Sequence, residues 1–156
     1  MGTVAIVDYG VGNLKSVANA LSYLGCSSCI TADPAELERA DAIILPGVGA
    51  FPDAADRLRS GGLDQHVLAQ GQKKPVLGIC LGMQLLLEQG REVRPCPGLG
   101  VIRGTVDRIP TKASCPTLDG TACGFFTTRP CSGGWTRGRM STSSTPSAPK
   151  TPIPPR

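Results

Sequence analysis

The stretch VLGICLGMQLLLEQG, residues 76–90, decides the fold class of this chain. Its first part is a short apolar run, Cys80 follows between two glycines, and a helical apolar pattern begins at Leu81. GICLG, residues 78–82, has the G-x-nucleophile-x-G form of a sharp turn between a strand and a helix. In such a turn the central side chain is held above the sheet. We predict that Cys80 is a catalytic nucleophile. The alternative is a buried cysteine at a strand–helix junction whose glycines serve packing.

A nucleophile at such a turn lies next to hydrogen-bond donors. The helix that starts at Leu81 places its first backbone N–H beside Cys80 and favours the thiolate. The same N–H can stabilise an oxyanion. A second donor is expected from Gly47, Val48 or Gly49 in the PGVG turn of a neighbouring strand, because glycines let peptide planes reorient.

Strand and helix signals alternate over residues 1–110. Uniformly apolar strands that alternate with helices predict an α/β fold with a mostly parallel sheet covered on both faces. Three turns, DYGVGN, LPGVGAF and GICLGMQ, should face one crevice at the carboxyl ends of the strands. Strands are predicted at 3–9, 29–31, 41–47 and 74–80 with a later strand pair at 99–109, and helices at 11–25, 34–40, 52–70 (interrupted at 61–62) and 81–89.

The composition bounds the class of protein. The chain has 156 residues, of which 40% are hydrophobic, enough for one domain with its own core. No apolar run reaches the roughly 18 residues that suggest a membrane-spanning helix. The opening MGTVAIVDYG is predicted to form a first strand and not a signal peptide. We therefore expect a cytoplasmic protein with reduced cysteines.

Two features suggest other classes of site. Cys26 and Cys29 form a C-x-x-C, the spacing of a redox or zinc site, but zinc needs two more ligands and His66 is the single histidine. The other interpretation is two small apolar residues at a helix–strand junction. The net charge of +4 suggests a basic surface, yet residues 1–111 hold 10 Lys/Arg and 11 Asp/Glu. We predict no nucleic-acid site, no metal and no cofactor.

The composition changes abruptly at about residue 112. From Ala113 to Arg156 there is one Leu, one Ile and no Val, and Ser, Thr, Pro and Gly are frequent. Such a segment cannot supply a hydrophobic core. We predict a domain over residues 1–112 and a disordered tail over residues 113–156.

The motifs resemble those of a known family. GICLGMQLLLEQ resembles the nucleophile segment of the class I (triad-type) glutamine amidotransferases. DYGVGNLKSV, LPGVGAF and GLGVIRGTVDRIP are similar to segments of one branch of that family, the glutaminase subunits of imidazole glycerol phosphate synthase. The resemblance covers about residues 3–112 in order. It implies a flavodoxin-like α/β fold that is incomplete after about residue 112.

The resemblance also implies an activity. Cys80 would attack the side-chain amide of glutamine and form a thioester, with the oxyanion held by Leu81 and by Val48 or Gly49. Gly47 would contribute to substrate binding. Ammonia would pass to a TIM-barrel cyclase subunit, which makes imidazole glycerol phosphate and an aminoimidazole carboxamide ribotide in histidine biosynthesis.

Two further residues each have two interpretations, and a third has one. Gln84, one helical turn beyond Cys80, would bind glutamine by resemblance, or it is a solvated helix residue. Asn13 is expected near the cyclase, or it caps the first helix. Tyr9, in the same turn as Asn13, is likewise expected near the cyclase.

A thioester mechanism needs a base beside the thiol and a group that orients the base. In this family they are a His and a Glu in an FHPE-like segment near the C-terminus. No such segment occurs here, no Glu follows Glu92, and His66 lies upstream of Cys80. We interpret His66 as a surface helix residue, so the triad is incomplete as written.

The tail offers a reason for the missing segment. If the third base of each codon is joined to the first two of the next, permitted codons for residues 115–127 read PHIGWNSLRFLH, and those for residues 139–146 read YVYFVHS or YVYFVNS. The family carries similar PHMGWN and YFVHSY segments at about these places. We therefore predict that residues after about 112 are a frameshifted translation. A genuine disordered extension is the alternative.

Three functions follow. The first is the glutaminase subunit named above, with activity of this chain in doubt because the His and Glu are absent. The second is an inactive truncated subunit that only binds the cyclase. The third is another glutamine amidotransferase or cysteine hydrolase of the same fold.

Overall fold

The computed structural model describes residues 2–107, 124–125 and 141–142. Most of the predicted tail, residues 113–156, therefore lies outside the described residues, and so does the predicted boundary at residue 112. Within the tail, β8 (Gly124–Phe125) and β9 (Ser141–Thr142) pair as a short antiparallel ribbon.

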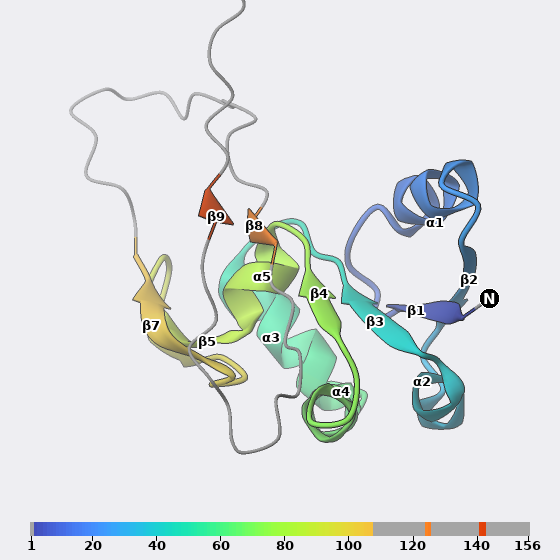
Figure 1. The fold of residues 1–156 in the computed structure, drawn as a ribbon. Coiled ribbons are helices and arrows are strands. Elements are labelled where there is room, and N and C mark those ends of the chain that lie inside the picture. The colour runs from blue at the N-terminus through green and yellow to red at the C-terminus, as the bar shows by residue number, and fades with distance from the viewer. Residues whose placement is uncertain (1, 108–123, 126–140, 143–156) are drawn as a thin grey trace, which may run out of the picture.

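Four parallel strands form the central sheet (Figure 1). Their order is β2-β1-β3-β4, and each predicted strand of the first 80 residues is confirmed. Because the strands are parallel, their carboxyl ends meet at one edge of the sheet, where the three predicted turns begin. The bounds are β1 (Thr3–Val7), β2 (Ser27–Thr31), β3 (Ala42–Leu45) and β4 (Val76–Gly78).

Helices cover both faces of this sheet, as the alternating pattern predicts. Figure 1 shows α1 (Leu14–Tyr23) on one side and α2 (Pro34–Arg39), α3 (Phe51–Ser60) and α4 (Leu63–Gly71) on the other. Asp33 caps α2 with its carboxylate accepting from the Ala35 N–H at 2.9 Å. None of the helices within the described residues is long and apolar enough to cross a membrane.

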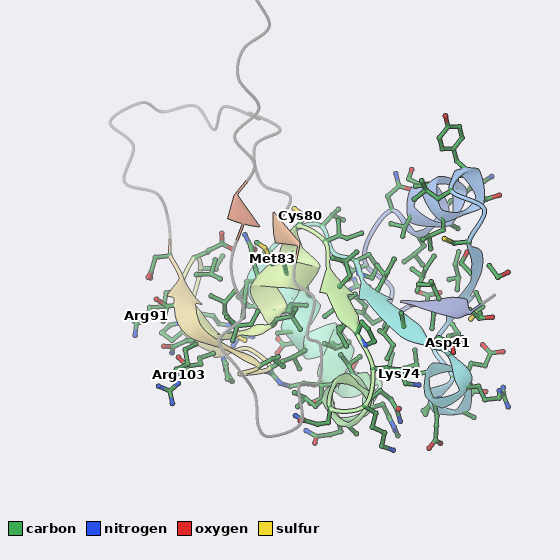
Figure 2. The ribbon with its side chains drawn as sticks, in the orientation of Figure 1. Asp41, Lys74, Cys80, Met83, Arg91 and Arg103 are labelled. Carbon is green, nitrogen blue, oxygen red and sulfur yellow. The ribbon has the colours of Figure 1, made fainter. Side chains whose placement is uncertain are left out.

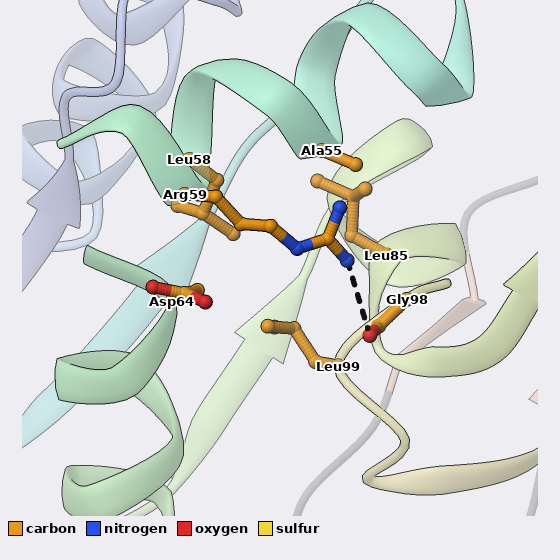
Figure 3. A pocket seen from close by; sticks show the side chains of 7 residues that line it. All are labelled: Ala55, Leu58, Arg59, Asp64, Leu85, Gly98 and Leu99. Atoms are coloured by element: carbon orange, nitrogen blue, oxygen red, sulfur yellow. Dashed lines mark hydrogen bonds between the residues drawn. The ribbon is translucent and has the colours of Figure 1, made fainter. Parts of the chain in front are cut away.

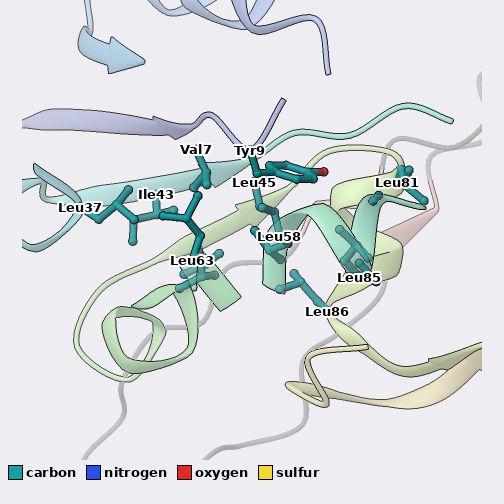
Figure 4. Close-up of a cluster of buried hydrophobic side chains, with 14 of the residues drawn as sticks. Val7, Tyr9, Leu37, Ile43, Leu45, Leu58, Leu63, Leu81, Leu85 and Leu86 are labelled. Atoms are coloured by element: carbon teal, nitrogen blue, oxygen red, sulfur yellow. The ribbon is translucent and has the colours of Figure 1, made fainter. Parts of the chain in front are cut away.

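The core lies between the sheet and the helices α2, α3, α4 and α5 (Leu81–Leu85) (Figure 4). Strands β1 and β3 supply the central side chains of the core. Leucines of α5 and the residue after it, which follow β4, pack at one end of the core. By contrast, no residue of α1 is fully buried. The buried side chains include Val7, Leu37, Ile43, Leu45, Leu58, Leu63, Leu81, Leu85 and Leu86.

Two predictions beyond residue 80 were wrong. The expected helix over 81–89 is a short helix α5 (Leu81–Leu85) followed by the strand β5 (Leu87–Gly90). The run LLLEQ suits a helix or a strand by apolar content alone, and pairing with neighbours selects the strand. Gly90 at the end of β5 also lies close to the ring of Phe51, where a Cβ would be 2.5 Å from ring carbons.

The expected strand pair over 99–109 is a single strand, β7 (Ile102–Val106). It runs parallel to β5, and β6 (Cys96–Pro97) pairs antiparallel with the other edge of β5. The three strands form a second small sheet in the order β6-β5-β7. The partner of β7 therefore comes from earlier in the chain and not from within the segment, of which residues 108–109 lie outside the described residues.

Candidate active site

Cys80 stands at a strained turn between β4 and α5. Its backbone has φ 53° and ψ −116°, and it is the one non-glycine residue with positive φ in the described part of the chain. Such a conformation costs about 1–3 kcal/mol and is kept only where the surroundings impose it. The residue is exposed and its thiol is free (Figure 2). This is the geometry of a nucleophile elbow.

The two glycines that flank Cys80 at a distance of two residues are required by packing. A Cβ at Gly82 would lie 1.9 Å from the Leu45 carbonyl oxygen, and a Cβ at Gly78 would lie 2.5 Å from the Met83 Cα. No side chain fits at these distances. The backbone of the elbow therefore folds directly onto β3 and onto α5, as the spacing in GICLG predicts.

The turn LPGVGAF after β3 lies against this elbow. A Cβ at Gly47 would lie 2.7 Å from the Gly82 nitrogen and 2.9 Å from the Leu81 Cβ. Beyond Gly47 the turn opens, since Val48 is 55% exposed and a Cβ at Gly49 would meet no atom within 4 Å. The structure thus brings the two predicted oxyanion segments together.

Backbone donors at this point are available. The Leu81 N–H belongs to the first turn of α5, where N–H groups have no acceptor within the helix. Among the hydrogen bonds of the described residues, none uses the N–H of Leu81, Val48 or Gly49 as a donor. Gln84 is half-buried on α5, one turn beyond Cys80. Its predicted contact with substrate stays a prediction.

The third turn, DYGVGN after β1, joins the other two through Tyr9. The Tyr9 hydroxyl donates to the Pro46 carbonyl at 2.6 Å, and the ring is only 6% exposed. Burial raises the pKa of Tyr9, so the phenol stays a neutral donor. The three predicted turns therefore meet at one edge of the sheet.

Asn13 caps α1. Its side-chain oxygen accepts from the Ser16 N–H at 3.2 Å, which is the capping interpretation left open above. Next to it, a cavity of about 270 Å³ separates residues 10–12 from residues 48–50 and is bordered by Asp53 and Arg57. The Arg57 guanidinium donates to the Gly10 carbonyl at 3.3 Å and so ties α3 to this turn.

No base stands beside the thiol in the described residues. His66, the single histidine of the chain, is exposed on α4. Helix α4 leads into the amino end of β4, whereas Cys80 follows the carboxyl end (Figures 1 and 2). The interpretation of His66 as a surface helix residue agrees with this position.

The C-x-x-C segment has the wrong shape for a disulfide. Cys26 precedes β2 and Cys29 lies within it, so residues 27 and 28 between them are extended. Three extended steps of about 3.3 Å place the two Cα atoms roughly 10 Å apart, beyond the ~7 Å limit for a disulfide. Burial, together with the Glu36 carboxylate, raises the pKa of the Cys29 thiol, with Arg39 opposing.

A metal site is not formed by this segment either. Within the described residues, no three His, Cys, Asp or Glu side chains gather closely enough to hold a metal ion. Cys26 is exposed at the end of α1 and Cys29 packs against the core. The segment matches the interpretation as small apolar residues at a helix–strand junction.

Arg59 is a site-supporting residue that the sequence analysis missed. From α3 it spans a shallow apolar depression and donates to the carbonyls of Pro97 and Gly98, the latter at 3.5 Å (Figure 3). These contacts join the end of β6 and the residue after it to α3, the helix at the end of the LPGVGAF turn. An arginine in a helix of ordinary surface pattern carries no sequence signal for this role.

Comparisons with known proteins agree with this geometry. The profile of the family described as glutamine amidotransferase class-I matches residues 5–127. An imidazole glycerol phosphate synthase subunit HisH of Symbiobacterium thermophilum is 50% identical over 119 residues, which cover 76% of this chain and 56% of that protein. The subunit HisH of Methanopyrus kandleri is 50% identical over 115 residues, which cover 74% and 58%.

A solved structure titled as a crystal structure of glutamine amidotransferase has the same fold. It superposes with a TM-score of 0.61 at 23% identity and covers 80% of this chain and 62% of that chain. The chain thus spans a little over half the length of the curated relatives it matches. Because the family profile matches most of the chain and includes the elbow, the chain belongs to the class-I glutamine amidotransferase family.

Proposed function

We propose that this chain is a glutaminase subunit of imidazole glycerol phosphate synthase, which hydrolyses glutamine to glutamate and ammonia. The observation that carries the proposal is the strained, exposed Cys80 at an elbow packed against the PGVG turn. The relatives named imidazole glycerol phosphate synthase subunit HisH support the choice of glutamine and of this synthase.

The chemistry follows from the elbow. The Cys80 sulfur adds to the side-chain amide carbon of glutamine, and the carbonyl oxygen becomes an oxyanion. The Leu81 N–H and the N–H of Val48 or Gly49 donate to that oxyanion. Collapse breaks the C–N bond, and the nitrogen leaves as ammonia after it takes up a proton. Water then cleaves the thioester and releases glutamate, which restores the thiol.

Substrate and partner contacts complete the proposal. Gly47 and Gln84 would hold glutamine. The DYGVGN turn with Asn13 would face a TIM-barrel cyclase, which uses the ammonia to make imidazole glycerol phosphate and an aminoimidazole carboxamide ribotide. Because the Tyr9 ring is buried, a partner would meet the turn and not the phenol. The proposal includes a cytoplasmic location and requires no metal or cofactor.

The proton transfers need a base that the described residues do not hold beside Cys80. We propose that the segment that carries it is hidden by a frameshift, so that residues 113–156 are a shifted reading of the family's C-terminal part. Resequencing the gene across codons 108–118 tests this. A single intact frame that encodes residues 113–156, confirmed in independent reads, would contradict it.

A second candidate is an inactive subunit that binds the cyclase, and the exposed position of His66 away from the elbow favours it. The two differ in one measurement. Chain mixed with purified cyclase should form a complex under either proposal, and only the first predicts ammonia release from glutamine. Another glutamine amidotransferase of the same fold would show glutaminase activity without complex formation.

The site itself is tested by labelling with the chloroketone analogue of L-glutamine. The tryptic peptide of residues 74–91 carries Cys80 and no other cysteine, and the peptide of residues 16–39 carries Cys26 and Cys29 as internal controls. We expect selective modification of Cys80 by the L-analogue over its D-enantiomer. Equal labelling of both peptides, or no preference between enantiomers, would refute a glutamine site at the elbow.

A further inference from the structure

The contact between Tyr9 and Pro46 has more than a packing function. A phenylalanine would fill the same space in the core, so the ring alone does not explain the hydroxyl. The hydroxyl is buried and finds its acceptor in a backbone carbonyl 37 positions away in the chain, at 2.6 Å. In Figure 4 the hydroxyl points along the core toward the region of Leu81. A buried hydroxyl needs such a partner, and the partner is in turn fixed by it.

The fixed group is the first peptide unit of the LPGVGAF turn. The Pro46 carbonyl and the Gly47 N–H belong to one planar peptide, so holding the carbonyl also fixes the direction of that N–H. Gly47 is enclosed further, because a Cβ there would lie 2.7 Å from the Gly82 nitrogen and 2.9 Å from the Tyr9 hydroxyl. The turn is thus clamped up to Gly47.

The next residues lack such support. Val48 is 55% exposed, and Gly49 has φ +95° with no atom within 4 Å of a Cβ position. Support resumes at Phe51, which is fully buried at the start of α3. The clamp at Pro46 and the anchor at Phe51 therefore leave a segment of three residues, 48–50, whose starting direction is set by Tyr9.

We propose that Tyr9 is a positioning residue for the oxyanion donors: its hydroxyl clamps the Pro46–Gly47 peptide against the Cys80 elbow and thereby sets where the N–H groups of residues 48 and 49 point. The oxyanion role rests on the proposed function, whereas the clamp is argued from contacts within the fold alone. It gives Tyr9 a role inside the chain in place of the partner contact expected from resemblance.

The clamp is tested first without any substrate. Tyr9→Phe removes only the hydroxyl, and Tyr23→Phe is the matched control because Tyr23 is 92% exposed. Amide hydrogen exchange, read by mass spectrometry on peptides that cover residues 45–51, should be faster by about fivefold or more in Tyr9→Phe and unchanged in Tyr23→Phe. Peptides from α2 and β2 should be unaffected. Unchanged exchange at 45–51, or faster exchange across the whole chain, would overturn the proposal.

The consequence for the site is read at Cys80. The rate of labelling by the L-glutamine chloroketone, divided by the rate with iodoacetamide, should fall about tenfold in Tyr9→Phe, because small misplacement of a donor lowers the rate of an oriented reaction. Equal losses with both reagents, or an unchanged ratio beside faster exchange, would show that Tyr9 is structural only. If the wild-type chain does not prefer the L-enantiomer, the proposed function fails, and the exchange experiment alone decides the clamp.

Discussion

The two ends of the central sheet differ in backbone strain and in hydrogen bonding (Figure 2). At the carboxyl end, Cys80 is held at φ 53° and glycines let backbone segments approach closer than any side chain permits. At the amino end, two charged side chains hydrogen-bond backbone groups. Asp41 accepts from the Thr3 N–H at 2.7 Å, and the Lys74 ammonium donates to the carbonyls of Leu37, Glu38 and Ala40 at 3.0, 2.6 and 2.6 Å.

The difference teaches where strain is kept in a parallel sheet. At the amino end, side chains supply the hydrogen bonds that the backbone lacks. Lys74, for example, donates to carbonyls at the end of α2 that have no donor within the helix. The carboxyl end, where we propose the nucleophile, keeps an unfavourable backbone at Cys80 and N–H groups that have no acceptor among the described residues. An attacking thiol and an oxyanion would use these features. Substitutions at the two ends should therefore differ in sign and size.

The largest effect is expected at Gly82. Gly82→Ala would place a Cβ 1.9 Å from the Leu45 carbonyl oxygen, so the elbow must move away from β3. We expect a loss of more than about 4 kcal/mol in the free energy of unfolding, or no folded protein. The control is Gly61→Ala, whose Cβ would lie 3.7 Å from Leu63 side-chain atoms at an ordinary φ of −85°. Urea unfolding of both variants decides, and similar midpoints would show that the close approach is not real.

At the opposite end, Lys74→Met should be the most costly exchange. It removes three charge-assisted hydrogen bonds to the end of α2 and leaves carbonyls without donors, an expected loss of about 2–3 kcal/mol. Lys73→Met is the matched control, because Lys73 reaches only Glu38 at 4.0 Å with both side chains mostly exposed. It should change stability by less than about 0.5 kcal/mol. Equal losses of stability in the two variants would show that the hydrogen bonds of Lys74 do not stabilise the end of α2.

The pH dependence of stability should report the buried Tyr9. The folded-state pKa is raised, so above the ordinary value near 10 the unfolded chain releases the tyrosine proton while the folded chain keeps it. Fewer protons on the unfolded chain mean that stability falls as pH rises. Relative to Tyr9→Phe, the wild type should lose about 1.4 kcal/mol between pH 9 and pH 11. Parallel curves for the two proteins, measured by urea unfolding at each pH, would show that Tyr9 ionises freely.

The smallest effect, and the one of opposite sign, is expected at Cys80. Glycine adopts positive φ without strain, so Cys80→Gly should be more stable than Cys80→Ala by about 1 kcal/mol. At Cys29, inside β2, the order should reverse, because glycine weakens a strand. Thermal unfolding of the four variants provides the test. A Cys80→Gly variant less stable than Cys80→Ala would mean that the elbow is relaxed.

Much of the first 80 residues is predictable because the signals are local. Asp33 and Pro34 start α2, the Gly61–Gly62 pair separates α3 from α4, and short apolar runs mark the parallel strands. Each of these depends on residues within a few positions of one another. The GICLG spacing belongs to the same class of signal.

Predictions failed where contacts distant in sequence decide. Leu85 ends α5 and Leu87 begins β5, because β5 pairs with β7 and its last residue, Gly90, packs against Phe51. Arg59 and Lys74 each act on carbonyls more than 30 positions away. Tyr9 was expected near a partner by resemblance, but its ring is buried and its hydroxyl donates to the Pro46 carbonyl, a contact that has no local sequence signal.

By itself, therefore, the sequence determined the alternation of strands and helices, the place of Cys80 between two glycines and the lack of a second histidine, because these follow from neighbouring residues and simple counts. Only the tertiary structure decided that Cys80 has a strained backbone, that the Tyr9 hydroxyl donates to the Pro46 carbonyl, and that Cys26 and Cys29 are too far apart to form a disulfide. These depend on which distant backbones meet, and packing sets that only when the whole sheet is assembled.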